Sequence, residues 1–77
     1  MILPVAARNI LNDVAAKHEL PLEAIRQHSN YPEYVVARRE AAVLLHAGGW
    51  SDRRIGMLLG GFERSTIHNL RTSGGKA

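Results

Sequence analysis

Cysteine is absent from this 77-residue chain, aromatic residues make up only 5% of it, and long hydrophobic runs are missing. Without cysteine, the chain forms neither a disulfide nor a thiolate metal site. The longest apolar run, residues 41–45, is far too short to cross a bilayer, which takes about 20 residues. The first residues also lack the basic region of a secretory signal. We therefore expect a cytoplasmic protein with no role in a membrane.

The residue patterns of catalysis and metal binding are also missing. None of the four histidines is paired with another at the i, i+4 spacing of a helical zinc site. Ser65 has no nearby Asp–His pattern that would make it a nucleophile. A chain this short also has little material for a catalytic cleft once a core is packed. We expect no enzyme, no metal site and no cofactor.

Basic residues are concentrated in the second half of the chain, which has a net charge of +3 overall. Residues 1–37 carry three Lys or Arg and four Asp or Glu, a net charge of −1. Residues 38–77 carry seven and three, a net charge of +4. This distribution favours a polyanionic partner. The alternative interpretation is a basic face that contacts only solvent.

Apolar spacing and helix-end signals predict one all-α domain over residues 1–77, a small bundle of about five helices. Prolines mark the first turns of the first three helices, and paired glycines end the third and fourth. Ser51 is placed to cap the fourth helix. The predicted helices cover about residues 4–18, 21–27, 33–47, 52–59 and 63–72, followed by a flexible tail over 73–77. The side chains expected to face inward are Val5, Ile10, Leu11, Val14, Ala15, Leu22, Ile25, Val35, Val36, Ala42, Val43, Leu44, Leu45, Ile55, Leu58, Leu59, Phe62, Ile67 and Leu70.

Residues 51–72 have the pattern of a helix-turn-helix. Gly56 lies in the middle of the fourth predicted helix, where glycine costs about 1 kcal/mol relative to alanine. We therefore expect a close backbone approach there, by the next helix. Gly60 and Gly61 permit the positive φ angles of a turn, which Phe62 anchors. The fifth helix then begins with consecutive polar residues, at an N-terminus whose N–H groups favour phosphate.

These residues resemble a known family, the C-terminal DNA-binding domain of the bacterial replication initiator DnaA. The family pattern is Ile-Gly, a short apolar run, Gly-Gly-x-Asp-His, Ser or Thr, Thr, and Val or Ile. Residues 55–67 of this chain are similar, reading IGMLLGGFERSTI. Residues 36–45 resemble the family's long helix and residues 14–25 its first two helices. The resemblance covers roughly residues 10–70.

The resemblance implies a helical bundle of the Trp-repressor and DnaA type, whose helix-turn-helix reads duplex DNA in the major groove. In the family, a basic loop before the long helix reaches the adjacent minor groove. The resemblance places Arg64, Ser65 and Thr66 where the family contacts bases, and Arg39 where it keeps an arginine near phosphates.

This chain departs from the family at several positions. Glu63 stands in place of the family's Asp, and Arg64 in place of its His, which alters the base preference. Residues 28–35 are less basic than the family loop, and Ala37 replaces its minor-groove arginine. No Gly-x-x-x-x-Gly-Lys motif occurs, so we expect no ATPase domain in this chain.

We interpret the chain as a stand-alone domain that binds double-stranded DNA and regulates transcription or replication, in the nucleoid, with a phage or prophage origin as one interpretation. Arginine pairs bidentately with guanine, and small hydroxyls touch base edges. The expected base contacts are Arg64, Ser65, Thr66 and Asn69. The expected phosphate contacts are Arg38, Arg39, Ser51, Arg53, Arg54, Glu63, His68 and Arg71.

A second interpretation is a protein-interaction module that binds a replication or regulatory protein, with weakened DNA binding. The less basic segment over residues 28–35 motivates it. No coiled-coil pattern or dimerisation helix is apparent in the sequence, so the oligomeric state stays open.

Overall fold

Five helices make up the chain in the computed structural model, which describes residues 3–73. No strand occurs within that range, so the predicted all-α bundle is confirmed. Of the predicted tail over residues 73–77, Ser73 is the last residue of a helix and residues 74–77 lie outside the described residues. The helices are α1 (Val5–Lys17), α2 (Leu22–Ile25), α3 (Pro32–Ala47), α4 (Asp52–Leu58) and α5 (Arg64–Ser73).

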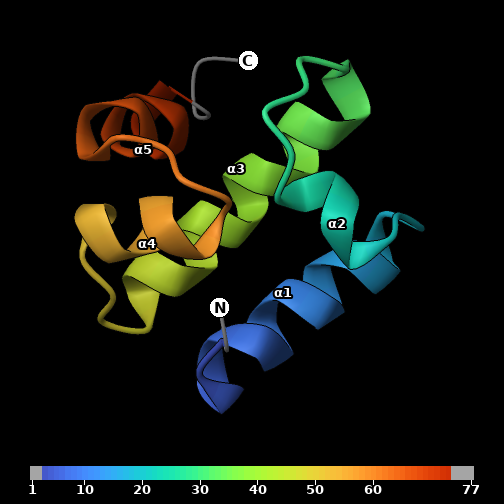
Figure 1. The fold of residues 1–77 in the computed structure, drawn as a ribbon, viewed down its shortest axis with the longest axis horizontal. Helices are drawn as coiled ribbons and strands as arrows, with labels where there is room; N and C mark the ends of the chain where they lie inside the picture. Colours follow the sequence, from blue (N-terminus) through green and yellow to red (C-terminus); the bar gives the residue numbers. More distant parts are fainter. Residues whose placement is uncertain (1–2, 74–77) are drawn as a thin grey trace.

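The longest helix, α3, lies in the middle of the bundle and packs against each of the other four helices (Figure 1). In this view α1 and α2 lie on one side of α3, and α4 and α5 on the other. The candidate site described below belongs to the α4–α5 half. Among residues 3–73, no helix combines the length and apolar character needed to traverse a membrane.

Local sequence signals set the helix ends close to their predicted places. Pro32 occupies the first turn of α3, where its missing N–H is not needed. Gly49 follows the end of α3 with a φ of +97°, a conformation that favours glycine. The Ser51 hydroxyl accepts a 3.3 Å hydrogen bond from the Arg54 N–H and caps α4, as predicted.

Small residues bring α1 and α3 close together in the core. The contact between these helices is lined largely by alanines and leucines that are fully buried or nearly so. Side chains of this size let two helix axes approach closely. The buried apolar residues of the two helices are Ala7, Leu11, Val14, Ala15, Ala37, Ala41, Ala42 and Leu45.

The inward face of α3 differs from the prediction. Val36, Val43 and Leu44 were expected in the core, but they are 48%, 44% and 42% exposed. The buried face instead follows Ala37, Ala41 and Leu45 at four-residue spacing, because the close neighbours of α3 leave room for alanine rather than valine. Val5 was also expected to face inward, and it is 73% exposed.

Arg38 joins the two halves of the bundle from inside. Its side chain is buried, and its Nε donates to the Ile25 carbonyl at 3.2 Å. A terminal nitrogen donates to the carbonyls of Gln27 and Ser29, the latter at 3.1 Å. The guanidinium carbon also lies 5.0 Å from the centre of the Phe62 ring, in the turn before α5. The predicted phosphate contact at Arg38 is therefore wrong, since the guanidinium binds the protein's own carbonyls.

Candidate nucleic-acid interface

Helices α4 and α5 pack against each other through a tight turn over residues 59–63. The Gly56 carbonyl, inside α4, accepts hydrogen bonds of 2.9 Å from both the Gly61 and Phe62 N–H groups. A Cβ added at Gly56 would collide with the Phe62 carbonyl. The predicted close approach at Gly56 is confirmed, but the approaching backbone belongs to the turn and not to the next helix.

The paired glycines of the turn have the positive φ angles that the sequence predicted. Gly60 has φ +104° and Gly61 φ +99°. A Cβ at Gly60 would also collide with the Arg26 carbonyl, so the turn packs directly on the end of α2. The His28 ring stacks on Phe62 with 4.1 Å between ring centres, and its Nε2 lies 3.0 Å from the Gly60 oxygen. These contacts hold the turn, and with it the start of α5, against the rest of the bundle.

Helix α5 buries one side and exposes the other. Ile67 is fully buried, and Leu70 is partly buried against the core. All four residues predicted to contact bases are exposed: Arg64, Ser65, Thr66 and Asn69. None of these four side chains is buried in the interior, so each is accessible to a ligand.

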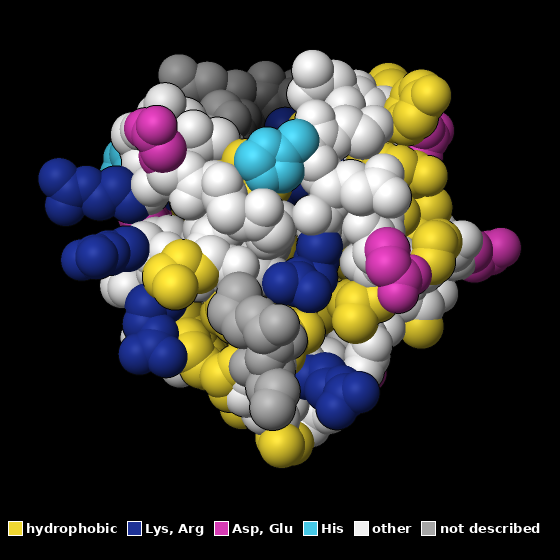
Figure 2. Space-filling model, viewed as in Figure 1, with side chains coloured by type: hydrophobic (Ala, Val, Ile, Leu, Met, Phe, Trp, Pro, Cys, Tyr) yellow, Lys and Arg dark blue, Asp and Glu magenta, His cyan; other side chains and the backbone are white. Residues whose placement is uncertain are grey.

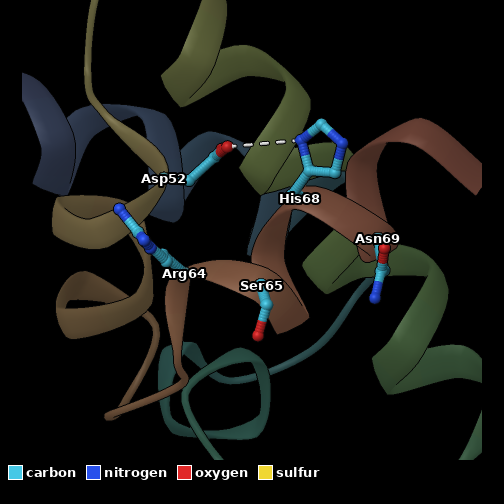
Figure 3. A pocket seen from close by; sticks show the side chains of 5 residues that line it. All are labelled: Asp52, Arg64, Ser65, His68 and Asn69. Carbon is cyan, nitrogen blue, oxygen red and sulfur yellow. Dashed lines mark ion pairs between the residues drawn. The ribbon is translucent and has the colours of Figure 1, made fainter.

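A shallow depression of about 390 Å³ lies beside α5 and gathers three of these four residues. It is lined by Asp52, Arg64, Ser65, His68 and Asn69 (Figure 3). Figure 3 shows Arg64 and His68 on the side of α5 that faces Asp52, whereas Ser65 and Asn69 point away from that carboxylate. Thr66 is exposed but does not line the depression.

An ion pair between Asp52 and Arg71 fastens the start of α4 to the last turns of α5. The Arg71 Nε and a terminal nitrogen donate to the two Asp52 oxygens at 2.7 and 3.0 Å. This hydrogen bonding lowers the pKa of Asp52 and raises that of Arg71. His68 Nδ1 lies 3.7 Å from the same carboxylate. Arg71 was expected to contact phosphate; the structure pairs its guanidinium with Asp52, and the phosphate contact stays a prediction.

The remaining arginines predicted to contact phosphate differ in how they are held. Arg39 donates from Nε to the Leu70 carbonyl at 3.2 Å, so it too braces α5 against α3. Arg53 and Arg54 are exposed at the start of α4. The Arg54 guanidinium lies 5.2 Å from the centre of the Trp50 ring.

The side chains of Arg53 and Arg64 make no hydrogen bond or ion pair with any residue in the range 3–73. Figure 2 shows several Lys and Arg side chains along the side of the molecule formed by α4 and α5, while most acidic side chains in view lie on the opposite side. This side therefore presents cations that are free to meet an anion.

Two further predicted phosphate contacts lie at helix starts. Ser51 is exposed, and its hydroxyl already accepts the capping hydrogen bond of α4. Glu63 is exposed immediately before α5, and its carbonyl accepts a 3.1 Å hydrogen bond from the Ile67 N–H. A carboxylate repels phosphate, so any phosphate contact at Glu63 has to come from its backbone N–H.

Asp52 is the residue at this site that sequence reasoning missed. An acidic residue directly after a Ser cap is typical of a helix's first turn and gives no sign of a distant partner. Its pairing with Arg71, nineteen positions along the chain, depends on how α4 and α5 pack. Among the described residues, no group of three or more His, Cys, Asp or Glu side chains is placed to hold a metal ion.

No family model, no curated protein and no solved structure matches this chain. The resemblance to the initiator's DNA-binding domain therefore stays a prediction based on the residues 55–67 pattern.

Proposed function

We propose that the protein binds double-stranded DNA, with α5 in the major groove and the arginines at the start of α4 on the flanking phosphates. In this proposal the chain is a stand-alone domain that resembles the C-terminal domain of DnaA and regulates transcription or replication. The observation that carries the proposal is the exposed polar face of α5, where Ser65 and Asn69 have no partner among residues 3–73, beside the free cations Arg53 and Arg64.

The dimensions of α5 suit a groove-reading helix. An α-helix with its side chains is about 10–12 Å across, and the major groove of B-DNA, about 12 Å wide, admits it. The ten residues of α5 extend over about 15 Å along such a groove. The turn before α5 is held by backbone hydrogen bonds to Gly56 and by the His28–Phe62 stack. A helix fixed in this way has little backbone entropy to lose on binding.

The proposed roles follow from the chemistry of each side chain and from its exposure to solvent. Arg64 pairs with a guanine edge, and the hydroxyls of Ser65 and Thr66 contact neighbouring bases. Arg53 and Arg54 contact phosphates. Since a single module of this size makes a small DNA interface, we expect the strongest binding from tandem sites or from a second bound protein.

The test is the salt dependence of binding to a labelled random duplex, measured by fluorescence anisotropy. Each phosphate neutralised contributes about −0.9 to the slope of log K against log salt. We expect Arg53→Ala to make that slope shallower by about 1 and to weaken all sequences alike. The matched control is Arg8→Ala, which removes the same charge from an exposed position on α1 and should leave the slope unchanged.

The second candidate function is an interaction module for a replication or regulatory protein. It is favoured by the surroundings of the segment before α3. Arg26, at the end of α2, donates to the Leu58 carbonyl, and Arg38, within α3, is buried, so neither offers a free charge to a minor groove. Absence of duplex binding at about 50 mM salt, where phosphate contacts are strongest, would support this function over DNA binding.

A further inference from the structure

The polar side chains of α5 form two rows with different surroundings. Successive residues of an α-helix are rotated by about 100°, and the buried Ile67 marks the inward direction. Ser65 and Asn69 each lie about 160° from Ile67, directly opposite the core. Arg64 and His68 lie about 60° and 100° from it, on the flank toward α4. The row that points straight out of the protein is therefore Ser65 and Asn69.

The outward row is free, whereas its neighbours have partners. Neither the Ser65 hydroxyl nor the Asn69 amide makes a hydrogen bond with any residue of the described range. Thr72, also outward, donates its hydroxyl to the His68 carbonyl at 2.7 Å. His68 itself lies beside the Asp52 carboxylate. Asn69 thus has both an unused donor and an unused acceptor.

Asn69 makes no visible contribution to the stability of the fold. It lies in the middle of α5, where asparagine is a weaker helix former than alanine, leucine or lysine. Its side chain neither caps a helix end nor satisfies a buried group among residues 3–73. A solvated surface would accept any good helix former in its place.

We propose that Asn69 is a specificity-determining residue that reads adenine in the major groove, with the Ser65 hydroxyl contacting the same or the adjacent base. The inference rests on the proposed DNA binding and deepens it. An asparagine amide matches adenine with two hydrogen bonds, accepting from the N6 amino group and donating to N7. Guanine presents two acceptors at these places, so the Asn69 carbonyl would face the O6 oxygen.

The first experiment is selection from a randomised duplex library with the wild-type protein and with Asn69→Ala. We expect one adenine position in the wild-type site to lose its preference in Asn69→Ala, while the other positions keep theirs. Replacement of that adenine by another base should weaken wild-type binding roughly tenfold and should leave Asn69→Ala unaffected. Because Asn69 is exposed, circular dichroism of the variant should match the wild type.

A second variant and an altered base test the individual hydrogen bonds between Asn69 and adenine. In Asn69→Asp the side chain keeps its shape but only accepts, so the preference should move from adenine toward cytosine, whose N4 group donates. A duplex with 7-deazaadenine at the selected position lacks the N7 acceptor. It should bind the wild type about fivefold more weakly, from loss of one hydrogen bond, and bind Asn69→Ala as the normal duplex does.

Three results would overturn the inference, and they separate the role of Asn69 from DNA binding itself. A wild-type protein that prefers one sequence, with the same preference in Asn69→Ala, would leave DNA binding standing and remove the role of Asn69. Equal weakening of wild type and Asn69→Ala by 7-deazaadenine would do the same. Failure of the wild type to bind any duplex would remove the proposed function together with this inference.

Discussion

The arginines of α3 and those at the α4–α5 surface have the same chemistry but opposite surroundings. Arg38 and Arg39 donate to backbone carbonyls and brace the bundle, while Arg53 and Arg64 are exposed and bind nothing among residues 3–73. The difference arises from the acceptors nearby: the loop before α3 directs the Gln27 and Ser29 carbonyls toward Arg38, and α5 offers the Leu70 carbonyl to Arg39. A basic residue therefore indicates an anionic partner only when the fold has not already used its donors.

The largest expected effect is on stability, at Arg38. Replacement by alanine leaves the carbonyls of Ile25, Gln27 and Ser29 without their donor, and we expect a loss of about 3 kcal/mol in the free energy of unfolding. Urea denaturation followed by circular dichroism measures it. Arg38→Lys should recover little, since one ammonium cannot reproduce the guanidinium's fork. A stable Arg38→Ala with weakened DNA binding would show instead that this arginine serves a ligand.

The next effect concerns Gly56, on which the turn depends. Gly56→Ala places a methyl group against the Phe62 carbonyl, and we expect about 2 kcal/mol of destabilisation despite alanine's better helix propensity. Gly48→Ala is the matched control, because its Cβ would make only ordinary contacts, the closest at 3.4 Å. Thermal unfolding of both variants compares them directly. Equal stability of the two would mean that the turn does not approach α4 as closely as described.

Arg64 should behave in the opposite way to Arg38. Arg64→Ala removes an unpaired guanidinium, so we expect unchanged stability and a loss of about 1–3 kcal/mol in binding to the selected duplex, with relaxed sequence preference. Anisotropy titrations with selected and random duplexes measure both quantities. If affinity and preference are untouched, Arg64 does not read bases.

The smallest effect is the pH dependence from Asp52. Its pKa is depressed in the folded protein, so its contribution to stability is present above the unfolded carboxyl pKa of about 3.9 and is lost as the pH falls through the folded value. The carboxylate is close to solvent, so we expect only about 0.5 kcal/mol at neutral pH. Asp52→Asn should therefore be slightly less stable than wild type at pH 7, and the difference should shrink on acidification toward pH 3. A difference that grows in acid would contradict the pairing with Arg71.

Much of the fold follows from local signals in the sequence, because helix ends depend on residues close in the chain. The Ser51 cap and the paired glycines at positions 60 and 61 lie where such rules place them. Which face of α3 is buried did not follow, since the valines at 36 and 43 are more apolar than the alanines that the close neighbours admit. Apolar patterning carries no information on the distance between helices.

At the candidate site, too, local features were predictable from the sequence and contacts between distant segments were not. The exposure of Arg64, Ser65 and Asn69 was predictable from their polar neighbours at the start of a helix. The engagement of Arg38 and Arg71 was not, because their acceptors come from other segments and meet them only in the packed bundle. The partners that an arginine finds far away in the chain therefore have to be taken from the structure.

The central claim is that duplex DNA binds the outward face of α5 and the start of α4. The most direct measurement is the set of backbone amide chemical shifts recorded by NMR while a short duplex is titrated into the protein at low salt. We predict that the largest shifts fall on residues 52–54 and 64–69, with α1 unaffected. Shifts centred on α1 or on the exposed valines of α3, or no shifts at all, would contradict the claim.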